Sequence, residues 1–280
     1  MTNQIQVGID IGGTKMLAIA RDSEIQARSQ ITTGKDFSAA DAEAEIDRFM
    51  QTLSTPPRSI GIAIPGLVDG QGTVIACDVL PNLIGWQPLL AFSAICSIDV
   101  LNDAEAALRQ VVSDLKPQTV AVVVMVGTGI GSAIYVNGRV LRGANGWAGE
   151  LGSIPIGIEG KTLDAQASGA AILQQLGIDA DRLSTLVAAN DLTVVRSIES
   201  AGSSLGMGLA ALINLLNPES IVLAGGTFRW QGYLEAAMQS AERYSLADLW
   251  AGCRVQISPH GGDLVALGAS QYIKSARLRF

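Results

Sequence analysis

Apolar residues at every second position open the chain. Residues 7–13 (VGIDIGG) alternate in this way, which predicts a β-strand that buries the apolar set and turns Asp10 to the opposite side. The glycines that follow permit a tight turn whose backbone N–H groups can approach an anion. Apolar residues resume in 16–20 (MLAIA), so we expect a β-hairpin with a carboxylate on one arm.

A second segment repeats this arrangement about a hundred residues later, which is the usual size of one domain. Residues 122–136 (VVVMVGTGIGSAIYV) again predict a strand, a glycine-threonine turn and a strand, so two related halves are expected. No charged residue occurs between Pro117 and Gly138. The glycines within this run, its β-branched residues and the Asn137-Gly138 turn signal nevertheless argue against a membrane span.

Further elements fill the space between and after these hairpins. Residues 39–53 and 201–216 carry apolar residues at helical spacing, and the second helix should stop at Asn217-Pro218. Short strands are expected at 59–66, at 97–103 and at "IVLAGG", residues 221–226. Strands that alternate with helices predict a layered α/β fold.

Four predicted strands end in residues suited to binding a ligand. These residues are Asp10-Gly12-Gly13-Thr14, Asn102-Asp103, Gly127-Thr128-Gly129 and Gly225-Gly226. Open α/β sheets bind ligands at the carboxyl ends of their strands. Each group has a purely structural alternative. For Asn102-Asp103 the alternative is that these residues serve simply as the start of a helix, with Glu105 completing a capping box. Their recurrence at the same place in the architecture favours a binding function.

Composition narrows the class of protein. With 280 residues, 48% of them hydrophobic, the chain can bury the core of one large domain or two ordinary ones. A net charge of −7 argues against a nucleic-acid partner. The three cysteines are widely spaced without a CxxC pair, so neither a disulfide framework nor a zinc site is expected. A cytoplasmic protein without a signal peptide or membrane partner fits best.

The motifs together resemble the ROK family of sugar kinases, within the actin-like ATPase superfamily. The resemblance rests on VGIDIGGTK (7–15), PNLIGW (81–86), LNDAEAA (101–107), the stretch from 126 to 152 and LNPESIVLAGG (216–226), in that order. It implies two actin-like (ribonuclease H-like) α/β lobes flanking an interlobe cleft, and commonly a homodimer. We expect a smaller lobe at 1–102, completed by a C-terminal helix at 265–280, and a larger lobe at 103–264. Because six residues precede Val7, we do not expect the DNA-binding domain of family repressors.

The resemblance also implies roles in phosphoryl transfer, which depends on positioning and charge balance. Asp103 would be the catalytic base, and Asp10 would hold Mg²⁺ through coordinated water. The nucleotide-binding set would be Asp10, Gly12, Gly13, Thr14, Lys15, Gly127, Thr128, Gly129, Gly225 and Gly226, although the position of Lys15 is more typical of a solvated side chain.

By the same resemblance, the sugar would be bound by Pro65, Gly66, Asn82, Asn102, Asp103, Glu150 and Asp164. Buried sugar hydroxyls need such polar partners, because an unpaired group costs about 1–3 kcal/mol. Asn82 has an alternative role as a turn residue after Pro81. His260, the only histidine, is expected in a loop.

One departure from the family pattern concerns zinc. Most ROK kinases place a histidine three residues after the glutamate that matches Glu150, followed by a zinc-binding cysteine cluster. This chain has Ser153 there, no cysteine in residues 154–169, and Asp164 in place of a second glutamate. The loop from Ser153 to Leu163 must therefore be held by packing or remain mobile.

The expected function is ATP-dependent phosphorylation of a hexose, at the 6-hydroxyl of glucose or a related sugar. N-acetylmannosamine and fructose are alternative substrates, and polyphosphate is an alternative donor. A non-catalytic sensor of sugar or nucleotide is the alternative from another class. The retained acidic and threonine residues favour catalysis, whereas the lost histidine and cysteines leave room for the sensor.

Overall fold

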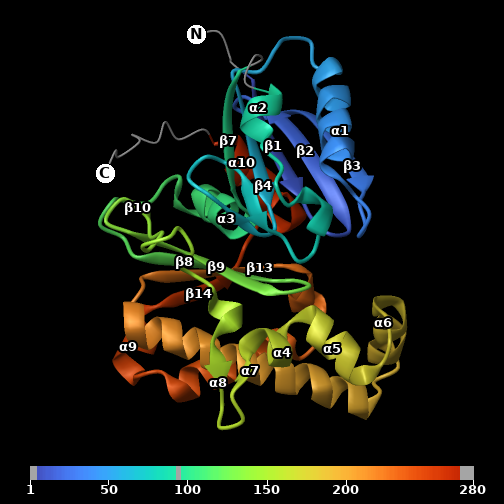
Figure 1. The fold of residues 1–280 in the computed structure, drawn as a ribbon. Coiled ribbons are helices and arrows are strands. Elements are labelled where there is room, and N and C mark those ends of the chain that lie inside the picture. Colours follow the sequence, from blue (N-terminus) through green and yellow to red (C-terminus); the bar gives the residue numbers. More distant parts are fainter. Residues whose placement is uncertain (1–4, 93–95, 272–280) are drawn as a thin grey trace. The chain divides into compact units, whose positions relative to one another are not determined.

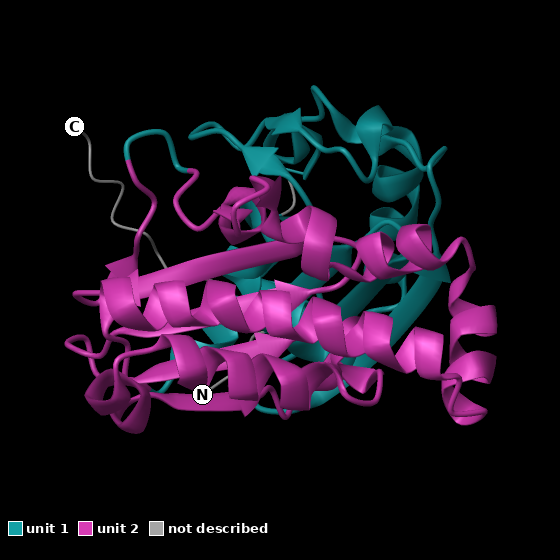
Figure 2. Ribbon diagram, turned by 90° about the horizontal axis from the view of Figure 1, so that it is seen from below, with its two compact units in different colours: residues 1–114, 144–146, 262–280 teal, residues 115–143, 147–261 magenta. Residues whose placement is uncertain are grey.

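The computed structural model describes residues 5–92 and 96–271. The chain divides into two compact units (Figure 2). Unit 1 comprises residues 1–114, 144–146 and 262–280, and unit 2 comprises residues 115–143 and 147–261. The predicted boundary after Asn102 falls inside unit 1, at the junction of a strand and a helix. Of the helix expected at 265–280, residues 272–280 lie outside the described part.

Unit 1 is built on a five-stranded sheet with the order β3-β2-β1-β4-β7 (Figure 1). The first three strands form an antiparallel meander, and β4 and β7 then run parallel to β1. The strands are β1 (Gln6–Ile11), β2 (Lys15–Arg21), β3 (Ile25–Thr32), β4 (Ser59–Ile64) and β7 (Ser97–Asn102). A small hairpin of β5 (Leu67–Val68) and β6 (Val74–Ala76) precedes a 3-10 turn η1 (Pro81–Leu83) and α2 (Pro88–Phe92).

Helices cover both faces of this sheet. The apolar residues of β1 pack with α1 (Ala39–Gln51) in one core cluster, as the alternating pattern predicts. On the other face lies α10 (Leu264–Ser270), which approaches so closely that a Cβ on Gly8 would lie 1.8 Å from the Ala266 carbonyl oxygen. Helix α3 (Asp103–Val112) packs beside α10, where Gly268 approaches the Ala106 backbone. Gly8, the glycine of β1, is therefore required by packing against α10.

Unit 2 repeats the same sheet with the order β10-β9-β8-β13-β14. Again the first three strands are antiparallel and the last two run parallel to the first. The strands are β8 (Ala121–Val126), β9 (Ile130–Val136), β10 (Arg139–Val140), β13 (Ser220–Ala224) and β14 (Arg254–Ile257). Because both units share this order and these directions, the predicted relationship between two halves is confirmed at the level of topology.

Helices also build the core of unit 2. Helix α7 (Leu192–Leu216) lies against α8 (Tyr233–Tyr244), and a Cβ on Gly202 or Gly206 would collide with the α8 backbone at 2.3 and 2.4 Å. As predicted, α7 stops at Asn217, which adopts the left-handed conformation at φ 45°. The remaining helices are α4 (Leu163–Ala167), α5 (Gly169–Leu176), α6 (Ala180–Ala188) and α9 (Ala247–Gly252), and the 3-10 turns are η2 (Leu151–Ser153), η3 (Gly226–Arg229) and η4 (Gly261–Asp263).

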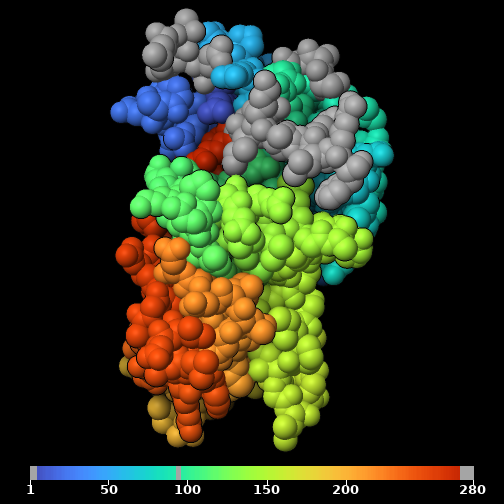
Figure 3. Space-filling view, turned by 90° about the vertical axis from the view of Figure 1, so that its left-hand side faces the viewer, coloured from blue at the N-terminus to red at the C-terminus, as the bar shows by residue number. Residues whose placement is uncertain are grey.

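The segment from Ser153 to Leu163 forms a small antiparallel hairpin, β11 (Pro155–Ile156) and β12 (Lys161–Thr162). In the space-filling view this lime-coloured hairpin extends as a narrow projection (Figure 3). Its tip is fully solvent-exposed at Ile158, while Ile156 at its base joins the core. The hairpin is therefore held by packing at its base, which is one of the two expected outcomes.

Among the described residues, no helix has both the length and the apolar character that crossing a membrane would require. The uncharged stretch before Gly138 instead forms β8 and β9, joined to β10 through Asn137 and Gly138, both at positive φ. The predicted hairpin turn is confirmed.

Candidate functional site

The glycine turn between β1 and β2 is a compact structure held by its own backbone. The Gly12 N–H donates to the Lys15 carbonyl at 2.8 Å, and the Thr33 hydroxyl donates to the Gly12 carbonyl at 2.6 Å. A Cβ on Gly13 would lie 2.2 Å from a methyl carbon of Val79. Thr14 at the tip is exposed. The turn thus presents an exposed hydroxyl on a fixed backbone, as binding a phosphate requires.

Asp10 lies one residue before the end of β1, opposite Leu17 of β2 and Ala63 of β4. Burial and the nearby charge of Asp103 raise the pKa of this carboxyl group to about 7, while Lys15 opposes the shift. The side chain keeps some exposed surface. The two carboxylates lie near one another at the carboxyl ends of β1 and β7, and together they form a negative site that a cation would neutralise.

The junction of β7 and α3 holds the predicted base. Asn102 caps α3, since its side-chain oxygen accepts the Ala104 N–H at 2.8 Å, and its amide donates to the Gly66 carbonyl at 3.0 Å. Asp103 also accepts the Ala104 N–H, at 2.8 Å. The capping role foreseen as the alternative for Asn102 is real, and it leaves Asp103 in the first helical turn, where a negative charge is stabilised.

Gly66 needs its lack of a side chain, because a Cβ there would lie 2.1 Å from the Ala76 carbonyl oxygen. The preceding carbonyl, that of Pro65, accepts a hydrogen bond from the Cys77 thiol at 3.2 Å. The end of β4 is thereby tied to the β5–β6 hairpin on one side and to Asn102 on the other.

Arg109 forms ion pairs near the junction of β7 and α3. Its guanidinium is almost fully buried and donates to Asp99 on β7 at 2.5 Å and to Glu105 on α3 at 3.1 Å. These partners raise the pKa of Arg109 against the effect of burial, which lowers it. The Arg109–Asp99 ion pair links α3 to β7, and these two elements meet at Asn102 and Asp103.

Asn82 lies in the 3-10 turn η1 with an exposed side chain, and its amide donates to the Asp36 carbonyl at 3.2 Å. This bond joins η1 to the segment that precedes α1. His260 lies in an exposed turn before η4, as expected.

Unit 2 carries a second glycine turn, between β8 and β9. The Gly127 N–H donates to the Gly129 carbonyl at 2.9 Å, and Thr128 at the tip is exposed. The start of α5 contacts this turn, because the Gly169 N–H donates to the Gly127 carbonyl at 2.8 Å. Like the turn of unit 1, it joins two antiparallel strands and presents an exposed threonine, and the backbone of α5 lies against it.

The glycine pair after β13 lies beside this turn. A Cβ on Gly225, at φ 119°, would lie 2.1 Å from the Val126 carbonyl oxygen, so only glycine fits. Gly226 opens η3, and the buried Thr227 hydroxyl donates to the Gly127 carbonyl at 3.4 Å. The structure thus brings together the two glycine-rich segments Gly127–Gly129 and Gly225-Gly226.

The remaining predicted sugar ligands, Glu150 and Asp164, also lie near one another. Partial burial raises the pKa of both carboxyl groups, and the charge of Asp164 adds to the shift of Glu150. Glu150 is exposed and directly precedes η2. Asp164 accepts the Ile130 N–H at 2.5 Å, which opposes its own pKa shift. One oxygen of its carboxylate, Oδ1, is therefore hydrogen-bonded to Ile130, the residue that follows the glycine turn.

Packing and one amide hold the β11–β12 hairpin against α4. The Gln166 amide donates to the carbonyls of Ile156 at 3.1 Å and Lys161 at 2.9 Å, one on each strand. Leu163 is fully buried against α7. Within residues 5–92 and 96–271, no three histidine, cysteine or acidic side chains are grouped so as to hold a metal ion.

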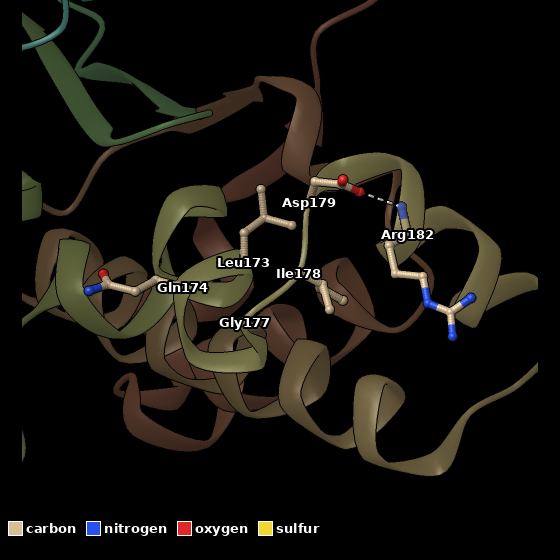
Figure 4. Close-up of a pocket in the computed structure, with 6 residues that line it drawn as sticks. All are labelled: Leu173, Gln174, Gly177, Ile178, Asp179 and Arg182. Carbon is tan, nitrogen blue, oxygen red and sulfur yellow. Dashed lines mark hydrogen bonds between the residues drawn. The ribbon is translucent and has the colours of Figure 1, made fainter.

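A surface hollow of about 620 Å³ lies elsewhere in unit 2, between the end of α5 and the start of α6 (Figure 4). Its lining residues are Leu173, Gln174, Gly177, Ile178, Asp179 and Arg182. Asp179 caps α6 by accepting the Arg182 N–H at 2.7 Å. The hollow contains none of the predicted site residues, and its only acidic group serves the helix.

Three features of the site escaped sequence reasoning. They are the helix start at Ser168-Gly169, the hydroxyl of Thr227 and the buried Arg109. A serine before an apolar run was available as a helix-start signal for the first. Arg109, on the apolar face of α3 and four residues after Glu105, could have been read as an ion pair. Nothing in the sequence distinguishes Thr227 from an ordinary loop threonine.

Comparison with known proteins gives the family. The family model described as "ROK family" matches residues 6–276. This chain belongs to the ROK family. The glucokinase of Halalkalibacterium halodurans is 30% identical, over 98% of this chain and 96% of its own length. The xylose repressor of Bacillus subtilis is 26% identical, over 78% of this chain and 63% of its own length.

Among solved structures, a ROK hexokinase from Thermus thermophilus superposes with a TM-score of 0.78 at 27% identity, covering 95% of this chain and 97% of that one. The predicted fold class, two α/β lobes of the actin-like type, is confirmed by this similarity and by the matching sheets of the two units. The expected cleft between the lobes stays a prediction, as do the roles of the individual site residues.

Proposed function

We propose that this ROK-family chain is an ATP-dependent sugar kinase that transfers the γ-phosphoryl group to a hexose hydroxyl. We take the 6-hydroxyl of glucose or a related hexose as the acceptor. The observation that carries the proposal is that each unit presents a glycine turn with an exposed threonine and that unit 1 also holds two neighbouring carboxylates, Asp10 and Asp103, at its strand ends.

In the proposed reaction the sugar oxygen forms a bond to the γ-phosphorus as the bond from that phosphorus to the bridging oxygen of ADP breaks. Asp103 accepts the proton of the attacking hydroxyl, and the start of α3 keeps it anionic. The turns at Gly12–Thr14 and Gly127–Gly129 donate N–H and hydroxyl groups to the phosphates. Gly225 and Gly226 allow the adenosine to lie close to the backbone.

Asp10 fits a divalent cation, because its raised pKa reflects a carboxylate that is both partly buried and close to another one. We propose Mg²⁺, held through coordinated water. Bound there, the ion would offset the negative charge of the phosphates and of both aspartates. Lys15, which already opposes the pKa shift of Asp10, adds positive charge on the same side.

The sugar would be held mainly by Asn102, Asp103 and Glu150, with the backbone of Pro65 and Gly66 and with Asn82 at the edge. Asn102 is well prepared for this, since hydrogen bonds to Gly66 and Ala104 fix its orientation before any ligand arrives. We further propose a cytoplasmic homodimer without a nucleic-acid partner, in line with the net charge of −7.

The test is ADP release with Mg-ATP across a panel of hexoses and N-acetylhexosamines, with polyphosphate as a second donor. At least one sugar should stimulate release, and Asp103→Asn should lower kcat by about 100-fold or more. Asp47→Asn, an exposed aspartate on α1, is the matched control and should change nothing. Equal turnover by Asp103→Asn and wild type would refute the assigned base.

The competing function is a sensor that binds sugar or nucleotide without turnover. It is favoured by the similarity to a xylose repressor. A sensor would show a rise in Tm with each sugar that it binds, and it would release no ADP.

A further inference from the structure

We propose that Asp164 is a positioning residue for the second phosphate turn and not a sugar ligand. The proposal rests on the proposed kinase function for the meaning of the turn. It departs from the sugar-binding role that family resemblance implies for this position. Its basis is a contact between the α4 carboxylate and the backbone directly after Gly127–Gly129.

The first observation is the partner of the carboxylate. Asp164 Oδ1 lies 2.5 Å from the amide nitrogen of Ile130, the first residue of β9 and the next after Gly129. Ile130 is buried, with 5% of its surface exposed. A buried N–H without a partner is costly, so the carboxylate meets a requirement of the turn itself.

The second observation is that the surroundings of the carboxylate are built from glycine. A Cβ on Gly129 would lie 3.6 Å from Asp164 Oδ1, and a Cβ on Gly152 would lie 2.7 Å from Oδ2. Gly152 also approaches the Ile130 carbonyl oxygen, which such a Cβ would meet at 2.4 Å. The carboxylate thus lies between the phosphate turn and the segment that follows Glu150, and its Oδ1 is already used by the Ile130 N–H.

The third observation is that the same helical segment contacts the turn at further points. The Gly169 N–H donates to the Gly127 carbonyl at 2.8 Å, and the Ala170 N–H lies 3.4 Å from the Thr128 carbonyl. Asp164 therefore completes a set of contacts from α4 and α5 that leaves Thr128 exposed while fixing the backbone on both sides of it. A turn held in this way needs no rearrangement when it binds a phosphate.

The contact also links two functions of unit 2. Asp164 lies close enough to Glu150 to raise the pKa of that carboxyl group. The Asp164 carboxylate that holds the turn is thus also part of the electrostatic surroundings of Glu150.

The experiment compares Asp164→Ala with Asp164→Asn, which retains an acceptor oxygen of the same length. Affinity is measured by calorimetry for adenylyl imidodiphosphate with Mg²⁺ and, separately, for glucose. Asp164→Ala should weaken the nucleotide analogue about tenfold or more and leave glucose within about twofold, and Asp164→Asn should restore most of the loss. Asp179→Ala is the matched control, because it removes another carboxylate that accepts a backbone N–H in unit 2, away from the turn.

Hydrogen exchange gives a readout that does not depend on activity. The peptide covering 126–134 should exchange faster in Asp164→Ala than in wild type, and should not change in Asp179→Ala. A loss of glucose affinity with unchanged nucleotide affinity would overturn the proposal, as would unchanged exchange in this peptide. If wild type bound neither ligand, the kinase function would fail, whereas exchange would still decide whether Asp164 holds the turn.

Discussion

Gly208 and Leu163 form a contact whose energy can be measured by a double-mutant cycle. Leu163 is fully buried at the start of α4, and Gly208 faces it from the interior of α7. A Cβ on Gly208 would lie 2.7 Å from Leu163 Cδ2 and 3.7 Å from Cδ1. Leu163 thus occupies space that a longer residue at 208 would need, and the pair ties α4 and the β11–β12 hairpin to the core.

The magnitudes follow from this geometry. Leu163→Ala should destabilise the protein by about 3 kcal/mol, as usual for a buried leucine. Gly208→Ala gains about 0.5–1 kcal/mol of helix stability but costs about 1–3 kcal/mol through overpacking, so it should be destabilising alone. With Leu163 truncated the clash disappears, and Gly208→Ala should become stabilising by roughly 1 kcal/mol. The coupling energy is then about 2 kcal/mol.

The assay is thermal unfolding of the four proteins followed by circular dichroism, where 1 kcal/mol corresponds to about 2–4 °C for a unit of this size. Gly252→Ala is the control, since it adds a methyl group to a helical glycine of the same unit with nothing within 4 Å. It should have the same small effect with either residue at 163. If Gly208→Ala shifted Tm in the same direction and by the same amount in both backgrounds, the packing argument would be refuted.

Three further outcomes are expected. Arg109→Met should lower the free energy of unfolding by about 3 kcal/mol in urea titrations, because Asp99 and Glu105 lose their buried partner; an unchanged midpoint would contradict this. Asn217→Gly should raise the free energy of unfolding by about 0.5–1 kcal/mol, because it relieves the strain of the left-handed backbone, and Tm should rise slightly. A lower Tm would show that the asparagine side chain is needed. Gln166→Ala should speed hydrogen exchange in residues 154–163 without changing the exchange of α7, and equal protection there would show that the amide bonds are dispensable.

Most strands of the two sheets could be predicted because they are marked locally, whereas β3 and β14 were not predicted. Alternation in residues 7–13, the glycine turns and the Asn137-Gly138 signal each act over a few residues, and the structure follows them closely. The β11–β12 hairpin had no comparable signal, since strands of two residues show no period. Its stability comes from Gln166 and Leu163, whose partners are fixed only by the tertiary fold.

The candidate site divides in the same way. The glycine turns and the junction at Asn102 were predictable because they lie at strand ends, which sequence patterns locate well. The partner of Asp164 was not, because its bond to the Ile130 N–H joins residues 34 positions apart and involves a backbone group that has no signature of its own. A family resemblance predicts which residue type stands at a position. Here Asp164 stands in place of the family's longer glutamate, and its contacts are known only from the structure.

The repeated topology also explains why the two units can differ in chemistry. Asp10 pairs with Ala63 across the sheet of unit 1, and the equivalent residue of unit 2, paired with Ala224, is Met125. The position after β7 holds Asp103, whereas β14 leads into Ser258. Unit 1 thus carries acidic groups at two strand ends where unit 2 has neutral residues.

A carboxylate at position 125, one residue before the end of β8, would repel a phosphate bound at Gly127–Gly129. In the proposed kinase, a neutral residue at 125 lets this turn bind phosphate through N–H groups, whereas the turn of unit 1, with Asp10 at the equivalent position, would need a cation. The exchange Met125→Asp would test this reasoning, since it should weaken binding of the nucleotide analogue far more than binding of glucose. Equal losses for both ligands would show instead that the substitution disturbs unit 2 as a whole.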